Sequence, residues 1–279
     1  MKKLILFILI ISTLCSCKSK PLPEEKSVVT PTGNTLETRF SAPDGYERLL
    51  AEDKSLLFFL RNYELKPDGA PVLLYNGTKK RNQNAHTAVF NLPIENVDLQ
   101  QCADSVMRMY AEYYWHTGEK DKIAFHFTDG FLCEYLMWRD GYRPIVGNSA
   151  TRWEKKTDLD NSYDNFVKYI KTVFTYAGTA SMEALEAETI PLYELDAGDI
   201  IIKGGSPGHV VMVVDVCKRA DGKKAFLLAQ GYMPAQEFHI IKNPLHENDP
   251  WYYEEEMTFP LNTAEYTFND ENMLRRLKY

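Results

Sequence analysis

Several signatures of common function classes are missing from this chain of 279 residues. It has neither a P-loop nor a dinucleotide-binding glycine fingerprint, which argues against a nucleotide cofactor. No basic cluster stands out and the formal net charge is −7, so nucleic acid is not an expected partner. The histidines lack the close spacing of zinc ligands. We therefore expect no metal and no cofactor.

Cysteine is scarce, and two of the five cysteines follow a short apolar segment at the start of the chain. Two lysines precede the apolar run 4–11, a pattern typical of a secretory signal rather than of a membrane span. Leu14 lies three residues before Cys17, and a serine directly precedes that cysteine, which resembles the bacterial lipobox. The resemblance implies that residues 1–16 are a signal peptide and that Cys17 carries a lipid.

This start predicts an extracytoplasmic protein anchored through Cys17 to a bacterial membrane, the outer membrane being favoured. Residues 17–45 are rich in proline, serine, threonine and charge, which predicts a flexible tether. Residues 46–279 are long enough for one large domain with a substantial core. The three cysteines of that domain are an odd number, so at least one thiol is expected to be free.

Two apolar runs around a glycine-rich turn are the most informative pattern in the domain. Residues 198–202 and 209–214 are rich in Val and Ile, which is typical of strands buried on both faces. Helices are expected from Asp98, a candidate N-cap, and from about Asn161, because apolar residues recur there at helical spacing. Helices placed before a run of antiparallel strands predict an α+β fold.

His209 begins the second of these strands. An imidazole held where a strand leaves a Gly-Pro loop would be rigid and open to a cleft, which suits a general base. Asp215, at the far end of the strand, is predicted to be a turn residue. A hydrogen-bonded structural histidine is the alternative interpretation of His209.

The second half of the domain resembles the NlpC-type cell-wall peptidases, which are papain-like. The segment 162–169, SYDNFVKY, is similar to the family's nucleophile helix, and 197–201 with His209 are similar to its Pro-Gly-Asp-Leu and histidine strands. The similarity covers about 161–243. It implies a papain-like core of helices packed on an antiparallel sheet, with an N-terminal α/β extension. It also implies that Gln230 orients the imidazole of His209.

A second resemblance extends over nearly the whole domain. Segments 99–104, 176–179 and 228–236 are similar to an uncharacterised family of bacterial lipoproteins, defined as a domain of unknown function. That family name carries no activity, so this resemblance adds no prediction of chemistry.

The peptidase resemblance places Tyr163 where the family has its cysteine nucleophile. A phenol ionises about 1.5 pH units above a thiol, so it is a poor replacement, and Tyr163 is more simply interpreted as a packed residue of the cleft or core. Cys102 offers another nucleophile, because it lies in the first turn of a predicted helix, where N–H groups and the helix dipole favour a thiolate. Cys102 is otherwise interpreted as a core residue.

Two functions remain open from the sequence. The favoured one is a tethered papain-like module without its motif-aligned nucleophile, which binds a peptide, a muropeptide or a partner protein of the cell envelope. The alternative is a thiol hydrolase or amidase of cell-wall or other peptides that uses Cys102, His209 and Gln230. A hydrogen-bonding distance between the Cys102 sulfur and the His209 ring, with Gln230 behind the imidazole, would favour the hydrolase, whereas a wide separation would exclude it.

Overall fold

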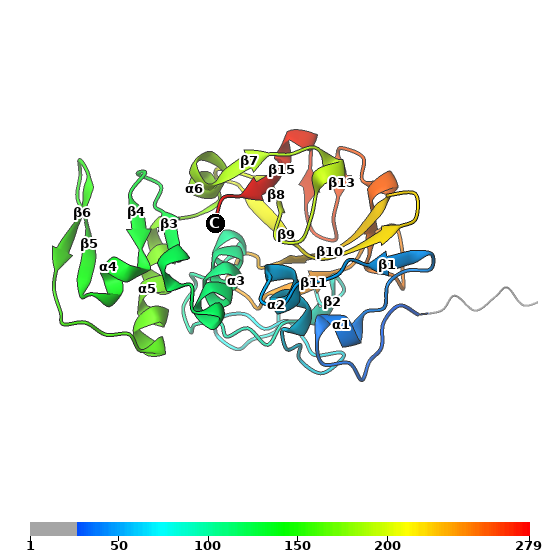
Figure 1. Cartoon of the computed structure of the whole chain (residues 1–279), viewed down its shortest axis with the longest axis horizontal. Coiled ribbons are helices and arrows are strands. Elements are labelled where there is room, and N and C mark those ends of the chain that lie inside the picture. The colour runs from blue at the N-terminus through cyan, green and yellow to red at the C-terminus, as the bar shows by residue number, and fades with distance from the viewer. Residues whose placement is uncertain (1–26) are drawn as a thin grey trace, which may run out of the picture.

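The computed structural model describes residues 27–279, so the expected signal peptide and Cys17 lie outside the described residues. This part of the chain has a mixed α+β fold with a mostly antiparallel sheet, as the sequence predicts (Figure 1). The helices are α1 (Leu36–Arg39), α2 (Leu56–Asn62), α3 (Cys102–Thr117), α4 (Tyr135–Arg139), α5 (Tyr163–Tyr176) and α6 (Thr179–Ser181). Short helical turns cover Lys120–Lys122, Met182–Glu186, Leu192–Glu194, Glu254–Glu256 and Glu271–Met273.

Nine strands of the described chain form the main sheet. Seven of them follow the order β2-β11-β10-β9-β8-β15-β7, while β1 pairs with β9 and β12 pairs with β10. These strands are β1 (Tyr46–Arg48), β2 (His86–Val89), β7 (Ala187–Thr189), β8 (Ile200–Lys203), β9 (His209–Arg219), β10 (Lys224–Gln230), β11 (His239–Ile241), β12 (Tyr252–Tyr253) and β15 (Leu274–Leu277). Three separate hairpins join β3 (Ala124–His126) to β4 (Leu132–Glu134), β5 (Tyr142–Val146) to β6 (Thr151–Lys155), and β13 (Leu261–Asn262) to β14 (Thr267–Phe268).

The central strands are buried on both faces, which explains their continuous apolar runs. Alternate residues of β8, β9 and β10 belong to two different hydrophobic clusters. On β9, Val210 and Met212 face the cluster that contains α3, whereas Val211 and Val213 face the cluster covered by the C-terminal segment with Phe268. Because successive side chains of a strand point to opposite faces, such a strand needs apolar residues at every position.

Asp215 is an exception inside β9, and the prediction of a turn residue is wrong for it. Its carboxylate is fully buried and accepts hydrogen bonds from Arg48 Nε at 2.9 Å and Arg61 Nε at 2.8 Å. The two guanidinium groups come from β1 and α2, which both pack on β9. A buried carboxylate is tolerated here because two opposite charges surround it.

Residues 27–45 also belong to the folded unit, which corrects the predicted tether for this described part of it. Leu36 and Phe40 are fully buried in the main core, and Arg39 is 1 % exposed. Helix α1 begins at a capping box, in which the Thr35 hydroxyl accepts the N–H of Thr38 and the Thr38 hydroxyl accepts the N–H of Thr35. The sequence predicted a tether because this short segment has few apolar residues among many polar ones.

The region around α4 and α5 extends to one side of the main sheet, together with the β3–β4 and β5–β6 hairpins (Figure 1). Helix α5 is capped by Ser162, whose hydroxyl accepts the N–H of Asn165. Its apolar stripe is buried as predicted from Phe166 to Phe174, but Tyr163, at its start, is exposed. It packs on α4 and α3, whereas α3 packs on β9 and β10. The helix that covers the central strands is therefore α3.

Candidate active site

Cys102 is the first residue of α3. At the start of the helix Asp104 Oδ2 accepts the Gln101 N–H at 3.0 Å, and Gln101 is the N-cap rather than Asp98 as predicted. The backbone N–H groups of Ala103 and Val210 each lower the pKa of the thiol, so both lie near it. The first belongs to the helix start and the second to β9, so the thiol lies where the helix meets the strand that His209 begins.

His209 and Gln230 face each other at the ends of adjacent antiparallel strands. His209 opens β9, Gln230 closes β10, and the His209 Nε2 atom lies 2.8 Å from Gln230 Oε1. The other ring nitrogen, Nδ1, has no hydrogen bond among the described residues.

The imidazole is more enclosed than the sequence predicts. His209 is only 3 % exposed, because the rings of Tyr232 and Tyr266 each pack with their centroids 4.7 Å from its own. Tyr232 lies in the loop after β10, and Tyr266 lies in the turn between β13 and β14. The predicted open cleft around the imidazole is therefore wrong for this conformation, in which two loop tyrosines cover the ring.

The same two tyrosines are neighbours of the thiol. Burial raises the pKa of Tyr266, and the nearby Cys102 thiol raises it further. For Tyr232, burial, Glu265 and then Cys102 raise the pKa of the phenol. Cys102 thus affects the titration of the two tyrosines that cover His209, although no hydrogen bond joins the thiol to the imidazole among the residues described.

Burial keeps both groups neutral at pH 7. It raises the pKa of Cys102 to about 11, with a further contribution from the Asp104 carboxylate. It lowers the pKa of His209 to about 4, against the opposing hydrogen bond of Gln230. The resting state is therefore a thiol beside a neutral imidazole, and a thiolate forms only when a proton moves from sulfur to a base.

A close approach of two backbones holds this arrangement together. Gly231 follows Gln230, and a Cβ atom at that position would lie 2.6 Å from the Gln101 carbonyl oxygen and 2.3 Å from Ser105 Oγ. Only a glycine lets the end of β10 come this near to the first turn of α3. The sequence contains this glycine, but nothing in the sequence alone shows what it approaches.

Tyr163, the residue at the motif-aligned nucleophile position, lies elsewhere. Its hydroxyl donates to Glu112 Oε1 at 2.5 Å and accepts from Arg108 Nη2 at 3.1 Å, and the side chain is 39 % exposed. Both partners lie in the second and third turns of α3, whereas Cys102 begins that helix. None of the contacts of Tyr163 within the described chain involves His209.

Three polar residues behind Gln230 were missed by the sequence analysis. Glu265 accepts a hydrogen bond from Gln230 Nε2 at 2.8 Å and forms an ion pair with Lys80, and His239 lies beside both. They come from three separate segments, and no local motif connects them. Lys80 is 7 % exposed and His239 is fully buried, which no polar pattern in the sequence indicated.

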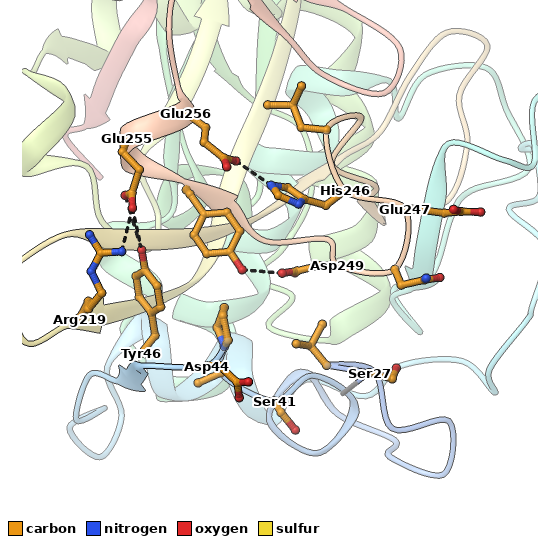
Figure 2. A pocket seen from close by; sticks show the side chains of 16 residues that line it. Ser27, Ser41, Asp44, Tyr46, Arg219, His246, Glu247, Asp249, Glu255 and Glu256 are labelled. Carbon is orange, nitrogen blue, oxygen red and sulfur yellow. Dashed lines mark hydrogen bonds and ion pairs between the residues drawn. The ribbon is translucent and has the colours of Figure 1, made fainter. Parts of the chain in front are cut away.

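A cavity of the described chain lies away from Cys102. It has a volume of about 1100 Å³ and is lined by Ser27, Val28, residues 41–44, Tyr46, Arg219, residues 245–249, Tyr253, Glu255 and Glu256. Figure 2 shows its ionic contacts, in which His246 pairs with Glu256 at 2.8 Å and Arg219 with Glu255 at 2.9 Å. Carboxylates outnumber cations on its wall, so the cavity favours a ligand with positive charge.

Residues 27–279 contain no cluster of three or more His, Cys, Asp or Glu side chains arranged to hold a metal ion. The three cysteines of this region, Cys102, Cys133 and Cys217, are all free and buried, which confirms the prediction of at least one free thiol. Within the same residues, no helix has both the length and the apolar character needed to cross a membrane.

Comparison with known proteins gives a family but no activity. Neither the curated proteins nor the solved structures contain a match to this chain. A family match covers residues 36–276, which begins at the first residue of α1 and ends within β15. The chain therefore belongs to the family described as "Domain of unknown function (4846)".

Proposed function

We propose that the protein is a thiol hydrolase or amidase in which Cys102 is the nucleophile, His209 the base and Gln230 the residue that orients the imidazole. The observation that carries the proposal is the His209–Gln230 hydrogen bond of 2.8 Å on the strand that also contacts the Cys102 thiol. A cysteine at a helix start, a histidine and a polar third residue are the three parts of a papain-like site.

The chemistry follows from these groups. Nδ1 of His209 takes the proton of the Cys102 thiol, and the thiolate sulfur attacks the carbonyl carbon of an amide. The N–H groups at the start of α3 stabilise the negative oxygen that forms. The C–N bond then breaks, the leaving amine takes the proton from His209, and water hydrolyses the thioester to regenerate the thiol.

The proposal assigns the papain-like roles to α3 rather than to α5. The tyrosine at the motif-aligned position, Tyr163, contacts Arg108 and Glu112 instead of the histidine strand. The presence of Tyr163 at that position is then no argument against hydrolysis. The region around α4 and α5 lies within residues 103–208, which separate the proposed nucleophile from the proposed base in the sequence. Of the similarity to NlpC-type peptidases, this proposal keeps the strands of His209 and Gln230 and gives up the match of 162–169 to the nucleophile helix.

Cell-wall peptides or other extracytoplasmic peptides are the proposed substrates. This choice depends on the expected signal peptide and on the lipid at Cys17, which would hold the protein at a bacterial membrane. A peptide must displace Tyr232 or Tyr266 to reach the imidazole. Both tyrosines belong to connecting segments, so they can move without disturbing the pairing of β9 with β10.

The test is hydrolysis by the full-length protein in detergent, with muropeptides and mixed peptides as substrates and mass spectrometry as readout. Cys102→Ser should reduce the hydrolysis rate by about three orders of magnitude or more. Cys133→Ser is the matched control, because this buried thiol does not contact His209, and it should leave the rate within about twofold. Hydrolysis that survives in Cys102→Ser would refute the proposal.

A binding role without hydrolysis is the second candidate, and the acidic cavity favours it. Two of its carboxylates, Asp44 and Glu247, form neither an ion pair nor a side-chain hydrogen bond within the described residues, so they are available to a cationic group of a ligand. Titration calorimetry with muropeptides that carry free amino groups tests this role. Binding that is lost in Asp44→Asn but kept in Cys102→Ser would support it, and no binding to the wild type would exclude it for these ligands.

A further inference from the structure

The amide of Gln230 has only one orientation that satisfies its neighbours. Its Oε1 atom lies 2.8 Å from His209 Nε2, and its Nε2 atom lies 2.8 Å from Glu265 Oε2. A carboxylate accepts hydrogen bonds but cannot donate them, so the amide must turn its NH₂ group to Glu265 and its oxygen to His209. The opposite orientation would place two acceptor oxygens against each other.

This orientation fixes the tautomer of the imidazole. Because the Gln230 oxygen only accepts, Nε2 of His209 must carry the proton. In the neutral ring, Nδ1 then has the free lone pair, and it is the nitrogen without a hydrogen bond among the described residues. That nitrogen is the one able to take a proton from the Cys102 thiol.

Glu265 is itself held in its ionised form. Lys80, which is 7 % exposed, forms an ion pair with Glu265 Oε2, and Asn82 Nδ2 donates to Oε1 at 3.3 Å. Burial raises the pKa of Glu265, but its polar contacts, among them the ion pair with Lys80, lower it to about 2. Glu265 therefore remains an acceptor throughout the pH range in which the protein works.

His239 completes the network from β11. Its Nδ1 atom lies 2.8 Å from the Glu237 carbonyl oxygen, so Nδ1 carries the proton. Its Nε2 atom is the acceptor for Lys80 Nζ at 3.3 Å and Gln230 Nε2 at 3.4 Å. His209 and His239 are thus held in opposite tautomers on the two sides of one glutamine.

We propose that Glu265, held by Lys80, is a positioning residue that fixes the Gln230 amide and, through it, the proton-accepting tautomer of His209. The role of this tautomer in catalysis rests on the proposed hydrolase function. The tautomer itself depends only on the contacts of Gln230. Loss of one charge-assisted hydrogen bond in such a network should lower the reactivity of the Cys102 thiol by about ten- to a hundredfold.

The first measurement is the long-range ¹H–¹⁵N spectrum of the imidazoles in the wild-type protein. It should show His209 protonated at Nε2 and His239 protonated at Nδ1, and His209 protonated at Nδ1 would overturn the proposal. The second measurement is the rate at which iodoacetamide alkylates Cys102, located by peptide mapping. Both measurements are independent of the natural substrate.

The decisive variant is the double substitution Lys80→Met with Glu265→Leu, which removes both charges and leaves neither buried alone. A population of His209 protonated at Nδ1 should appear, and alkylation should slow by about tenfold or more. Glu265→Gln keeps an acceptor oxygen, so its His209 tautomer and its Cys102 alkylation rate should both stay closer to those of the wild type. Asn82→Ala is the matched control, because it removes only the outer contact of Glu265 and should change neither readout.

An unchanged tautomer with an unchanged alkylation rate in the folded double variant would overturn the proposal. If the double variant does not fold, the tautomers of His209 and His239 in the wild-type protein decide whether the proposal holds. Failure of the hydrolase function would appear differently, as peptide hydrolysis that persists in Cys102→Ser while the His209 tautomer still responds to Glu265.

Discussion

Gly231→Ala is the substitution that tests the packing of the site most directly. The added Cβ atom would lie 2.6 Å from the Gln101 carbonyl oxygen and 2.3 Å from Ser105 Oγ. Ser105 can rotate its hydroxyl, but the Gln101 oxygen belongs to the backbone. A carbon contact is comfortable at about 3.5 Å, so the start of α3 would have to withdraw from β10 by roughly 0.9 Å.

Overpacking of this kind costs about 1–3 kcal/mol of unfolding free energy. Urea unfolding, followed by circular dichroism, measures that loss. The same withdrawal moves Cys102 away from β9, so alkylation of its thiol should also change in the folded variant. Gly178→Ala is the control, because no atom lies within 4 Å of its added Cβ, and it should change the stability by less than about 0.5 kcal/mol. Equal stability of wild type and Gly231→Ala would refute the argument that α3 and β10 are in tight contact.

Two further predictions concern buried titratable side chains. Burial lowers the pKa of His239 to about 4, whereas an unfolded histidine titrates near 6.5. As the pH falls, the unfolded chain therefore binds a proton at this histidine before the folded protein does. His239 loses its stabilising contribution between about pH 6.5 and 4 for that reason. The stability deficit of His239→Gln relative to wild type should therefore shrink by about 2 kcal/mol between pH 7 and pH 5 in urea titrations, and a constant deficit would show that the imidazole is not held neutral. Asp215→Asn should cost about 3 kcal/mol or more, because it leaves Arg48 and Arg61 without their buried partner, and a loss below 1 kcal/mol in the same assay would contradict this.

The central strands and the main helices were predictable because their patterns are local. The run that begins at His209 is apolar at nearly every position, and β9 is buried on both faces as expected. The pairing of His209 with Gln230 was predictable because a single turn joins their strands. Periodicity also placed the helices that contain Cys102 and Tyr163, although α3 begins four residues after the expected cap at Asp98.

The neighbours of the site were not predictable, because they are brought together only by the complete fold. Glu265 lies 35 positions from Gln230 in the sequence and contacts it through the turn of a short hairpin. Tyr266, in the same turn, covers the His209 ring, which is why an imidazole expected to be open is buried. The choice between Cys102 and Tyr163 also depended on long-range packing, since motif order alone favoured the position of Tyr163.

The place of β15 in the sheet has a consequence for the order of folding. This strand pairs with β8 on one side and β7 on the other, yet it is formed by residues 274–277. Until those residues have left the ribosome, the isoleucine-rich edge of β8 has no partner, and unpaired apolar edges of this kind promote aggregation. The sheet of the nascent chain can therefore be completed only after residues 274–277 have emerged, and a variant without them would leave the edges of β7 and β8 without this partner.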